Sequence, residues 1–249
     1  MSGSQSGSNS DAPKPPVLSD PLRAIREAPR GRPFVVAQLG QSLDGRIATR
    51  TGESRWINGQ PALVHVHRIR AAVDAVVVGI GTIIADDPIL NVRHVVGPNP
   101  ARVVLDPSGR LPLNARCLQD DGARRIVVRA TGTDAAVPKG VEVVRVARDG
   151  AQMPPGAVVQ ALWAAGLKTF LIEGGAQTVS GFLEAGAVDR MHVMVAPVIL
   201  GSGKPGLSLT PIDRLAQALR PKPEIHVFAD GDVLFDCDMR QTRPDTTKT

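Results

Sequence analysis

The residues best suited to chemistry gather at one turn, where an acidic residue and two glycines follow a short apolar run. Glu173 ends the run 169–172, and Gly174 and Gly175 separate it from residues with the apolar spacing of a helix. Glycines at such a turn leave backbone N–H groups open to a phosphate, which the helix dipole also favours. Glu173 would face the crevice in which open α/β sheets bind ligands. An ordinary tight strand-to-helix connection is the alternative, and this stretch alone leaves both open.

A second group of residues could hold an anion, namely Ser54, Arg70 and Arg93. Guanidinium groups bind phosphates through paired hydrogen bonds, although a single arginine is more often a solvated surface residue. The carboxylates best able to function are those of Asp44, Asp86, Asp87 and Glu173. For Asp44 and Asp87 we favour turn or helix capping.

The histidines and cysteines do not predict a metal site. His65 and His67 lie two apart on a predicted helix and therefore face different directions, so we interpret both as structural. The other histidines lack neighbours at ligand spacing. Two cysteines are too few for a disulfide framework or a zinc site, which is consistent with a reducing cytosol.

A Gly-x-Gly pair after a strand, at Gly79 and Gly81, suggests a dinucleotide-binding unit of the ordinary kind, but the match fails in detail. The third small residue of that pattern would fall at Ile84, and the proline of the segment 86–88 limits the following helix to about one turn.

These residues are positioned by alternating strands and helices. Strands are predicted at 34–39, 75–78, 101–105, 125–128, 141–144, 169–172 and 190–195. Helices are predicted near 21–27, 59–72, 158–165 and after 175, with a short helical piece near 212–219 and a Gly/Pro-rich loop at 201–206. Asp230 and Gly231 separate two final strands, 224–229 and 233–239, as in a hairpin. The pattern predicts an α/β fold with a mixed sheet.

Composition limits the class of protein. The chain has 249 residues, of which 43% are hydrophobic, enough to bury the core of one domain. Residues 1–33 and 240–249 each carry a net charge of +2, so most of the net +5 lies at the two ends and only +1 in the central portion 34–239, and aromatic residues are few. Nucleic-acid binding is therefore not expected. No apolar run is long enough to span a membrane. We expect a disordered leader at 1–30, one domain at 31–240 and a disordered tail at 241–249.

Five motifs in order resemble a known family. They are the segments 39–48, 52–57, 78–82 together with 85–88, 173–175 and 196–201. Together they are similar to the reductase domain of bacterial riboflavin biosynthesis, over about residues 33–239. That domain usually follows a zinc deaminase. The chain has no His-x-Glu and no Pro-Cys-x-x-Cys, so zinc-dependent deamination is not expected and we expect a stand-alone reductase domain.

The resemblance implies a dihydrofolate-reductase-like fold, with a mixed, mostly parallel sheet flanked by helices and an antiparallel C-terminal hairpin. It also implies a homodimer that uses NADPH to reduce the ribosyl group of a phosphoribosylamino-pyrimidine to a ribityl group, and the low cysteine content leads us to expect it in the cytoplasm. Residues implied at the NADPH site are Gly40, Trp56, Thr82, Asp86, and the loop Gly175, Ala176, Gln177, Thr178, Val179, Ser180 and Gly181. Residues implied at the substrate site are Ser54, Arg70, Leu90, Arg93 and Glu173. Asp86 or Glu173, or a water held by either, could manage the proton.

The sequence is also compatible with two alternative functions, and it offers two candidate residues for the 2′-phosphate of NADPH. Gln38 replaces a lysine that the family usually carries on its first strand, so a paralogous NADPH reductase of another heterocycle is an alternative. A non-catalytic NADPH-binding paralogue is a second alternative, although the retained Ser54, Arg70 and Arg93 argue against it. Ser108 and Arg110 are candidates for the 2′-phosphate of NADPH on their position alone.

Overall fold

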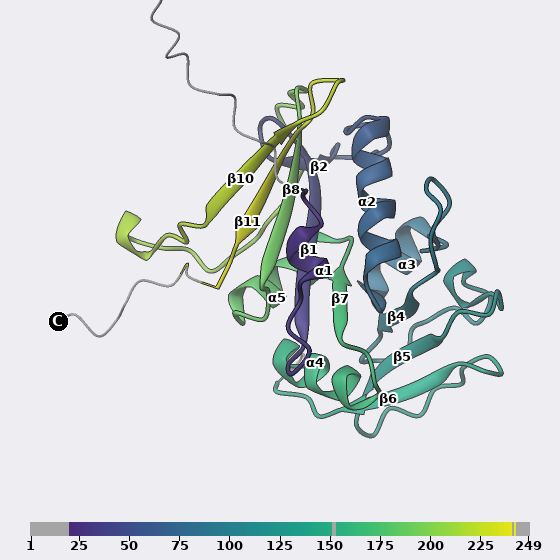
Figure 1. Ribbon diagram of the computed structural model, residues 1–249. Helices are drawn as coiled ribbons and strands as arrows, with labels where there is room; N and C mark the ends of the chain where they lie inside the picture. The colour runs from purple at the N-terminus through teal and green to yellow at the C-terminus, as the bar shows by residue number, and fades with distance from the viewer. Residues whose placement is uncertain (1–19, 151–152, 241, 243–249) are drawn as a thin grey trace, which may run out of the picture.

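A nine-stranded sheet with helices on both faces forms the body of the protein (Figure 1), in a computed structural model that describes residues 20–150, 153–240 and 242. The strands of this sheet are β1 (Phe34–Ser42), β3 (Ala75–Gly79), β4 (Ala101–Leu105), β5 (Arg125–Ala130), β6 (Glu142–Val146), β7 (Thr169–Ile172), β8 (Arg190–Ala196), β10 (Lys222–Val227) and β11 (Val233–Asp238). β2 (Arg46–Ala48) and β9 (Lys204–Pro205) form a separate pair. The α-helices are α1 (Arg23–Arg26), α2 (Gln60–Ala72), α3 (Ile80–Asp86), α4 (Pro155–Ala164) and α5 (Ala176–Glu184).

The sheet is mostly parallel, in the order β10-β11-β8-β1-β7-β3-β4-β5-β6. β1 is central, because it pairs in parallel with β7 on one side and β8 on the other. β11 runs antiparallel to both β8 and β10, so the C-terminal hairpin forms one edge of the sheet. This arrangement confirms the expected α/β fold with a mixed, mostly parallel sheet and an antiparallel terminal hairpin.

Alternate residues of the buried strands supply two cores, one on each face of the sheet. Val35 and Ala37 of β1 pack in the cluster that contains the apolar residues of α4 and α5. Phe34 and Val36 pack in the cluster that contains those of α1, α2 and α3. Because both faces are covered, the strands are continuous apolar runs, and this is why the sequence shows them clearly.

Some elements differ from the prediction. α3 has seven residues rather than one turn, because Pro88 lies beyond Asp87, which caps the helix in a left-handed conformation (φ +38°). The loop at 201–206 contains the short strand β9. The helical piece near 212–219 is a 3₁₀ turn at Leu215–Gln217.

The boundaries of the expected leader and tail fall partly outside the described residues. Residues 1–19 and 243–249 are not described. The part of the expected leader that is described carries α1, and Leu22 and Ile25 are buried against the core.

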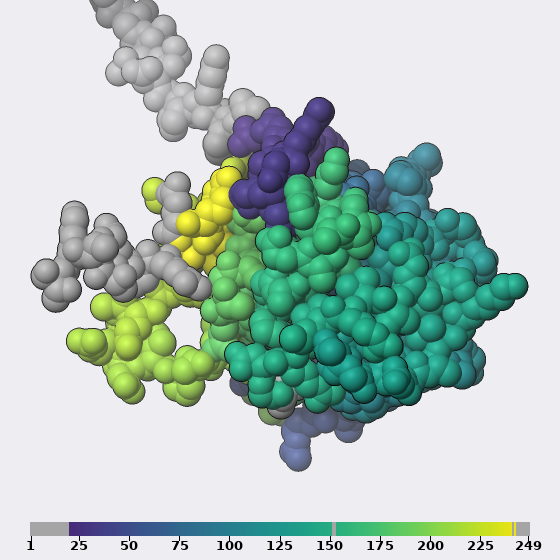
Figure 2. Space-filling model, turned by 90° about the horizontal axis from the view of Figure 1, so that it is seen from below, coloured from purple at the N-terminus to yellow at the C-terminus, as the bar shows by residue number. Residues whose placement is uncertain are grey.

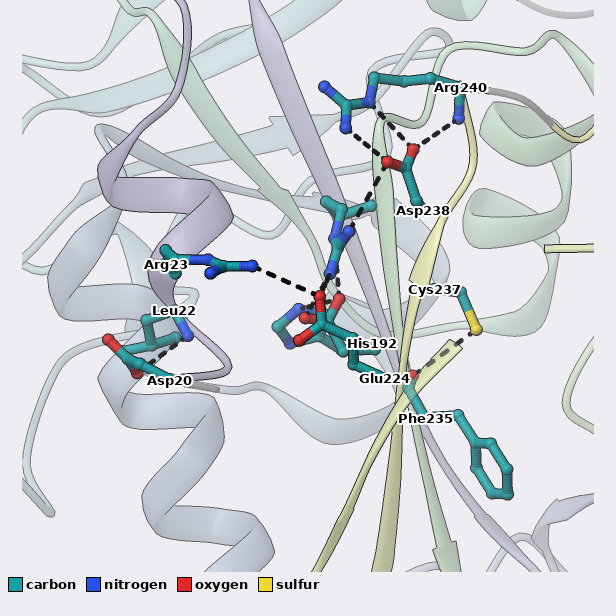
Figure 3. A network of polar contacts seen from close by, with 11 residues as sticks. Asp20, Leu22, Arg23, His192, Glu224, Phe235, Cys237, Asp238 and Arg240 are labelled. Carbon is teal, nitrogen blue, oxygen red and sulfur yellow. Dashed lines mark hydrogen bonds and ion pairs between the residues drawn. The ribbon is translucent and has the colours of Figure 1, made fainter. Parts of the chain in front are cut away.

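A network of charged groups fastens the hairpin to the rest of the sheet (Figure 3). Arg190 on β8 donates to Asp236 on β11 (Nε to Oδ1, 2.8 Å), and both side chains are buried. His192 lies against the same carboxylate (Nε2 to Oδ1, 3.1 Å). On its other side, His192 Nδ1 is 3.0 Å from Nε2 of His65, which α2 brings onto the sheet. Figure 3 also shows Arg23 of α1 directed at Glu224 of β10, 3.6 Å away.

The two histidines of α2 predict that acid destabilises the fold. Burial, and then the neighbouring His192, lowers the pKa of His65 to about 3. Burial, and then Arg70, lowers the pKa of His67 to about 3. Both rings are therefore neutral in the fold but bind a proton in the unfolded chain below its pKa of about 6.5. Stability is fully present above about pH 7 and is lost as the pH falls from 6.5 towards 3.

We expect each of these histidines to cost about 2 kcal/mol of unfolding free energy between pH 7 and pH 5. Urea unfolding at pH 7.5, 6.0 and 5.0 measures this directly. An unfolding free energy that stays level between pH 7 and pH 5 would contradict the assignment of both rings as buried and neutral.

Candidate active site

A cavity of about 750 Å³ lies at the carboxyl edge of β1, β7 and β3, beside the glycine turn. We call it the glycine-turn cavity. Its lining includes Gly40 on β1, Thr82 and Asp86 on α3, and Glu173 before the turn, followed by Gly174, Gly175, Ala176, Gln177 and Thr178. The carboxyl ends of parallel strands and the first turn of a helix thus meet at one place, as the sequence predicts for an anion-binding turn.

The glycine turn leaves no room for a side chain. Gly174 has φ +85°, and a Cβ there would lie 2.9 Å from Thr82 Oγ1. The N–H of Gly175 donates to the same hydroxyl at 3.2 Å, and a Cβ on Gly175 would also approach it to 3.2 Å. The turn therefore presents backbone atoms without side chains to the cavity. Its hydrogen bond to Thr82 holds it against α3. A dinucleotide diphosphate, which needs close approach to backbone N–H groups, fits this surface.

A second cavity, of about 480 Å³, lies beside the first, and we call it the arginine-lined cavity. Its lining includes Arg55, Trp56, Asn58 and Ala62, together with Arg93 and Met194. Gln38 and Ser54 line both cavities, so the two spaces meet at these side chains. The arrangement suits two ligands that share a contact zone, the second of them anionic.

Arg70 and Glu173 form a buried ion pair at the side of the glycine turn. Arg70 Nε donates to Glu173 Oε2 (2.9 Å), Nη2 pairs with Oε1, and Nη1 donates to the carbonyl oxygen of Asn91 (3.0 Å). Each nitrogen of the guanidinium thus makes a hydrogen bond within the protein, and Arg70 lies outside both cavity linings. Its clearest role is to orient the Glu173 carboxylate at the cavity wall.

Arg93 is placed differently from Arg70. It is exposed, lines the arginine-lined cavity, and makes one side-chain hydrogen bond, from Nη1 to Asn91 Oδ1 (3.2 Å). Its backbone N–H donates to His67 Nδ1 (3.1 Å), which ties this segment to α2. Partial burial, and then Arg70, lowers the pKa of Arg93, so an added anion would relieve the repulsion between the two guanidinium groups.

A small two-stranded flap, formed by β2 and β9, borders the glycine-turn cavity. β2 and β9 pair antiparallel, and Ala48, Gly52 and Lys204 of this region line the cavity. Asp44 fixes its base: the carboxylate accepts from the Ser42 hydroxyl (2.6 Å) and the N–H of Gly201 (2.8 Å), and its pKa falls to about 2 because of these and similar hydrogen bonds, that from Ser42 first. The capping role predicted for Asp44 is confirmed.

Several other residues expected at the site do not line the glycine-turn cavity. Beyond Thr178, the loop expected at the cofactor turns inward: Val179 and Ser180 are buried, and Gly181 lies outside the cavity lining. Trp56 lines the arginine-lined cavity, has φ +72° and is 81% exposed. Leu90 is buried, with φ +61°, and Ser108 lies outside both linings.

The cavity residues that were not predicted from the sequence include Arg55, Asn58 and Lys204. Arg55 and Lys204 are exposed cations without a hydrogen bond or ion pair to another described residue. Asn58 does not cap α2, whose N-cap is Gly59, but points at Gly40, where an added Cβ would meet its Oδ1. Arg55 could have been found, because it lies between two residues already singled out, whereas Lys204 needs β9 to be recognised.

No group of three histidine, cysteine or acidic side chains that could hold a metal occurs within 20–150, 153–240 and 242. Nor does any helix in that part of the chain have the length and apolar character to cross a membrane.

The comparisons with known proteins agree with this geometry. Residues 33–226 match the family described as RibD C-terminal domain. The chain belongs to this family. A 2,5-diamino-6-ribosylamino-4(3H)-pyrimidinone 5′-phosphate reductase of Methanothermobacter thermautotrophicus is 36% identical over 200 residues, which cover 76% of this chain and 90% of the relative.

Other relatives in the RibD C-terminal domain family are longer. The riboflavin biosynthesis protein RibD of Actinobacillus pleuropneumoniae is 31% identical over 212 residues, and the matched part is 56% of that relative, so the chain spans about half the length of several curated relatives. A solved deaminase/5-amino-6-(5-phosphoribosylamino)uracil reductase of Thermotoga maritima has 29% identity and a TM-score of 0.71, over 84% of this chain and 57% of that one. The expected resemblance is thereby confirmed.

Proposed function

We propose that this protein is an NADPH-dependent reductase of riboflavin biosynthesis, which reduces the ribosyl group of a 5-phosphoribosylamino-pyrimidine to a ribityl group. The observation that carries the proposal is the meeting of two cavities at Gln38 and Ser54. One cavity has the bare backbone that a diphosphate needs, and the other has arginines suited to a phosphorylated substrate. The printed names of the relatives support the reaction class.

In this reaction the bound nicotinamide supplies the hydride. The chain itself must hold the opened sugar beside it, exclude water and provide a proton at nitrogen. Both oxygens of Glu173 accept from Arg70, so Glu173 serves as a fixed acceptor for the substrate. Asp86 lines the glycine-turn cavity and makes no side-chain hydrogen bond to another described residue. We assign the proton to Asp86, or to a water that it holds.

Consumption of NADPH tests the function. Purified protein should oxidise NADPH when given the phosphoribosylamino-pyrimidine and should not do so with dihydrofolate. Tight binding of NADPH with no turnover of the pathway intermediate would refute the assignment and favour a paralogue.

Gln38 distinguishes the pathway enzyme from a paralogue that acts on another heterocycle. It lines both cavities, and the register of β1 and β8 places it beside His192. A lysine there would add a cation and up to three donors near the sugar. In the pathway enzyme, Gln38→Lys should preserve or raise kcat/KM for the intermediate, while the exposed control Gln160→Lys should change nothing. A wild type that turns the intermediate over poorly, with no recovery in Gln38→Lys, would indicate the paralogue.

We further propose that the protein acts in the cytoplasm as a homodimer. Ile225 and Val227 lie on one face of β10 and are 50% and 67% exposed, and Leu215, in the preceding loop, is 78% exposed. In Figure 2 the yellow-green segment before β10 projects from the body of the molecule. An apolar sheet edge of this kind suits a second copy of the chain.

Sedimentation tests the dimer. Val227→Glu should shift the wild-type dimer towards monomer, whereas the same change at Val96, which is fully exposed on a distant loop, should not. A wild-type protein that sediments as a monomer at micromolar concentration would contradict this proposal.

A further inference from the structure

The turn that follows β4 is held in one conformation. The Asp106 carboxylate is buried and accepts from the backbone N–H of Arg110 (2.8 Å). Gly109 adopts φ +76°, and a Cβ there would lie 2.8 Å from Arg129 Nη1. These contacts fix the position of the neighbouring Ser108, whose side chain is exposed at the carboxyl edge of the sheet.

A distant arginine reaches this turn. Arg148, which follows β6, donates from Nη2 to the carbonyl oxygen of Pro107 (2.7 Å) and to the Ser108 hydroxyl (3.3 Å). Its Nε and Nη1 make no hydrogen bond to another described residue, and no carboxylate among them pairs with it. The guanidinium is thereby oriented by the turn while most of its donors stay open.

Two exposed arginines at the turn have no carboxylate partner among the described residues. They are Arg148 and Arg110, and no hydrogen bond or ion pair joins the Arg110 side chain to another described residue. Arg129, in contrast, is 1% exposed, and its charge is balanced by Asp106, 3.3 Å from Nη2. The two exposed guanidinium groups therefore favour the approach of an anion to this turn.

The turn lies near the glycine-turn cavity, within reach of a dinucleotide whose diphosphate is bound there. Leu105 at the end of β4 pairs with Gly79, which lines that cavity. Ser108 is three residues beyond Leu105, a reach of at most about 10 Å. A diphosphate on Gly174 and Gly175 would therefore leave the adenosine half to extend along the same edge of the sheet, towards Ser108.

We propose that Arg148, positioned by the turn and acting with Ser108, binds the 2′-phosphate of NADPH and so selects NADPH over NADH. A guanidinium and a hydroxyl side by side suit a phosphate monoester, and NADH has no group there for them to bind. This inference rests on the proposed use of a nicotinamide dinucleotide by the glycine-turn cavity.

The test is calorimetric binding of NADPH, NADH, 2′-AMP and 5′-AMP to the wild-type protein and to Arg148→Ala, Arg148→Lys and Ser108→Ala. Arg145→Ala is the matched control, because Arg145 is a nearby exposed arginine on β6 that is already paired with Asp134. We expect Arg148→Ala to weaken NADPH and 2′-AMP by about tenfold or more and to leave NADH and 5′-AMP within twofold. Arg148→Lys should keep part of the preference, and Arg145→Ala all of it.

Either of two results would overturn this inference and leave the proposed function intact. One is a wild type that binds NADPH and NADH with equal affinity, and the other is a folded Arg148→Ala protein that keeps the wild-type ratio of the two affinities. A wild type that binds neither dinucleotide would instead refute the proposed function, and the inference with it.

Discussion

Arg70→Ala is expected to lower the free energy of unfolding by about 3–5 kcal/mol, because it leaves the Glu173 carboxylate buried without its counter-ion. Both side chains are largely buried, and two nitrogens of Arg70 bind the two carboxylate oxygens. Urea unfolding measures the loss. Replacing both partners by apolar residues, as in Arg70→Met/Glu173→Leu, should recover most of the stability while abolishing turnover.

Arg93→Ala is the matched comparison for Arg70→Ala. Arg93 is exposed and makes one weak side-chain hydrogen bond, so its removal should change the unfolding free energy by no more than about 0.5 kcal/mol. It should, however, raise KM for the phosphorylated substrate about tenfold or more and leave NADPH affinity unchanged. If Arg93→Ala weakened NADPH more than substrate, the two cavities would be assigned to the wrong ligands.

Gly175→Val is expected to weaken NADPH binding by about five- to more than a hundredfold, since overpacking costs about 1–3 kcal/mol. The added Cβ would lie 3.2 Å from the Thr82 hydroxyl, and the branches would enter the space assigned to the diphosphate. Calorimetry of NADPH binding measures the change.

The control is Gly156→Val in the first turn of α4, where an added Cβ meets nothing within 4 Å. That variant should bind NADPH as the wild type does. Wild-type affinity in a folded Gly175→Val protein would remove the glycine turn from the cofactor site.

The sequence predicts features that depend on neighbouring residues. The glycine turn was recognisable because strand, acid, glycines and helix follow one another within residues 169–185, and the structure places the turn in a cavity wall. The strands were recognisable because burial on both faces makes them uniformly apolar.

Features that depend on residues far apart in the sequence could not be predicted. The sequence predicts that Arg70 binds an anionic ligand. In the structure Arg70 pairs with Glu173, which lies 103 residues further along the chain. His65 and His192 are 127 residues apart, and no local pattern joins them. The flap strand β9 is only two residues long, too short for any periodicity to show.

The central position of β1 has a consequence for how the protein is made. β1 ends at Ser42, whereas its two partners, β7 and β8, begin at Thr169 and Arg190. At ordinary rates of translation the apolar strand waits on the order of 10 s for either partner. The centre of the sheet therefore forms only after both partners have emerged, and folding is governed by contacts distant in sequence, which are slow to form. Yield in cells should accordingly depend on chaperones that shield residues 34–39 until β7 and β8 have emerged.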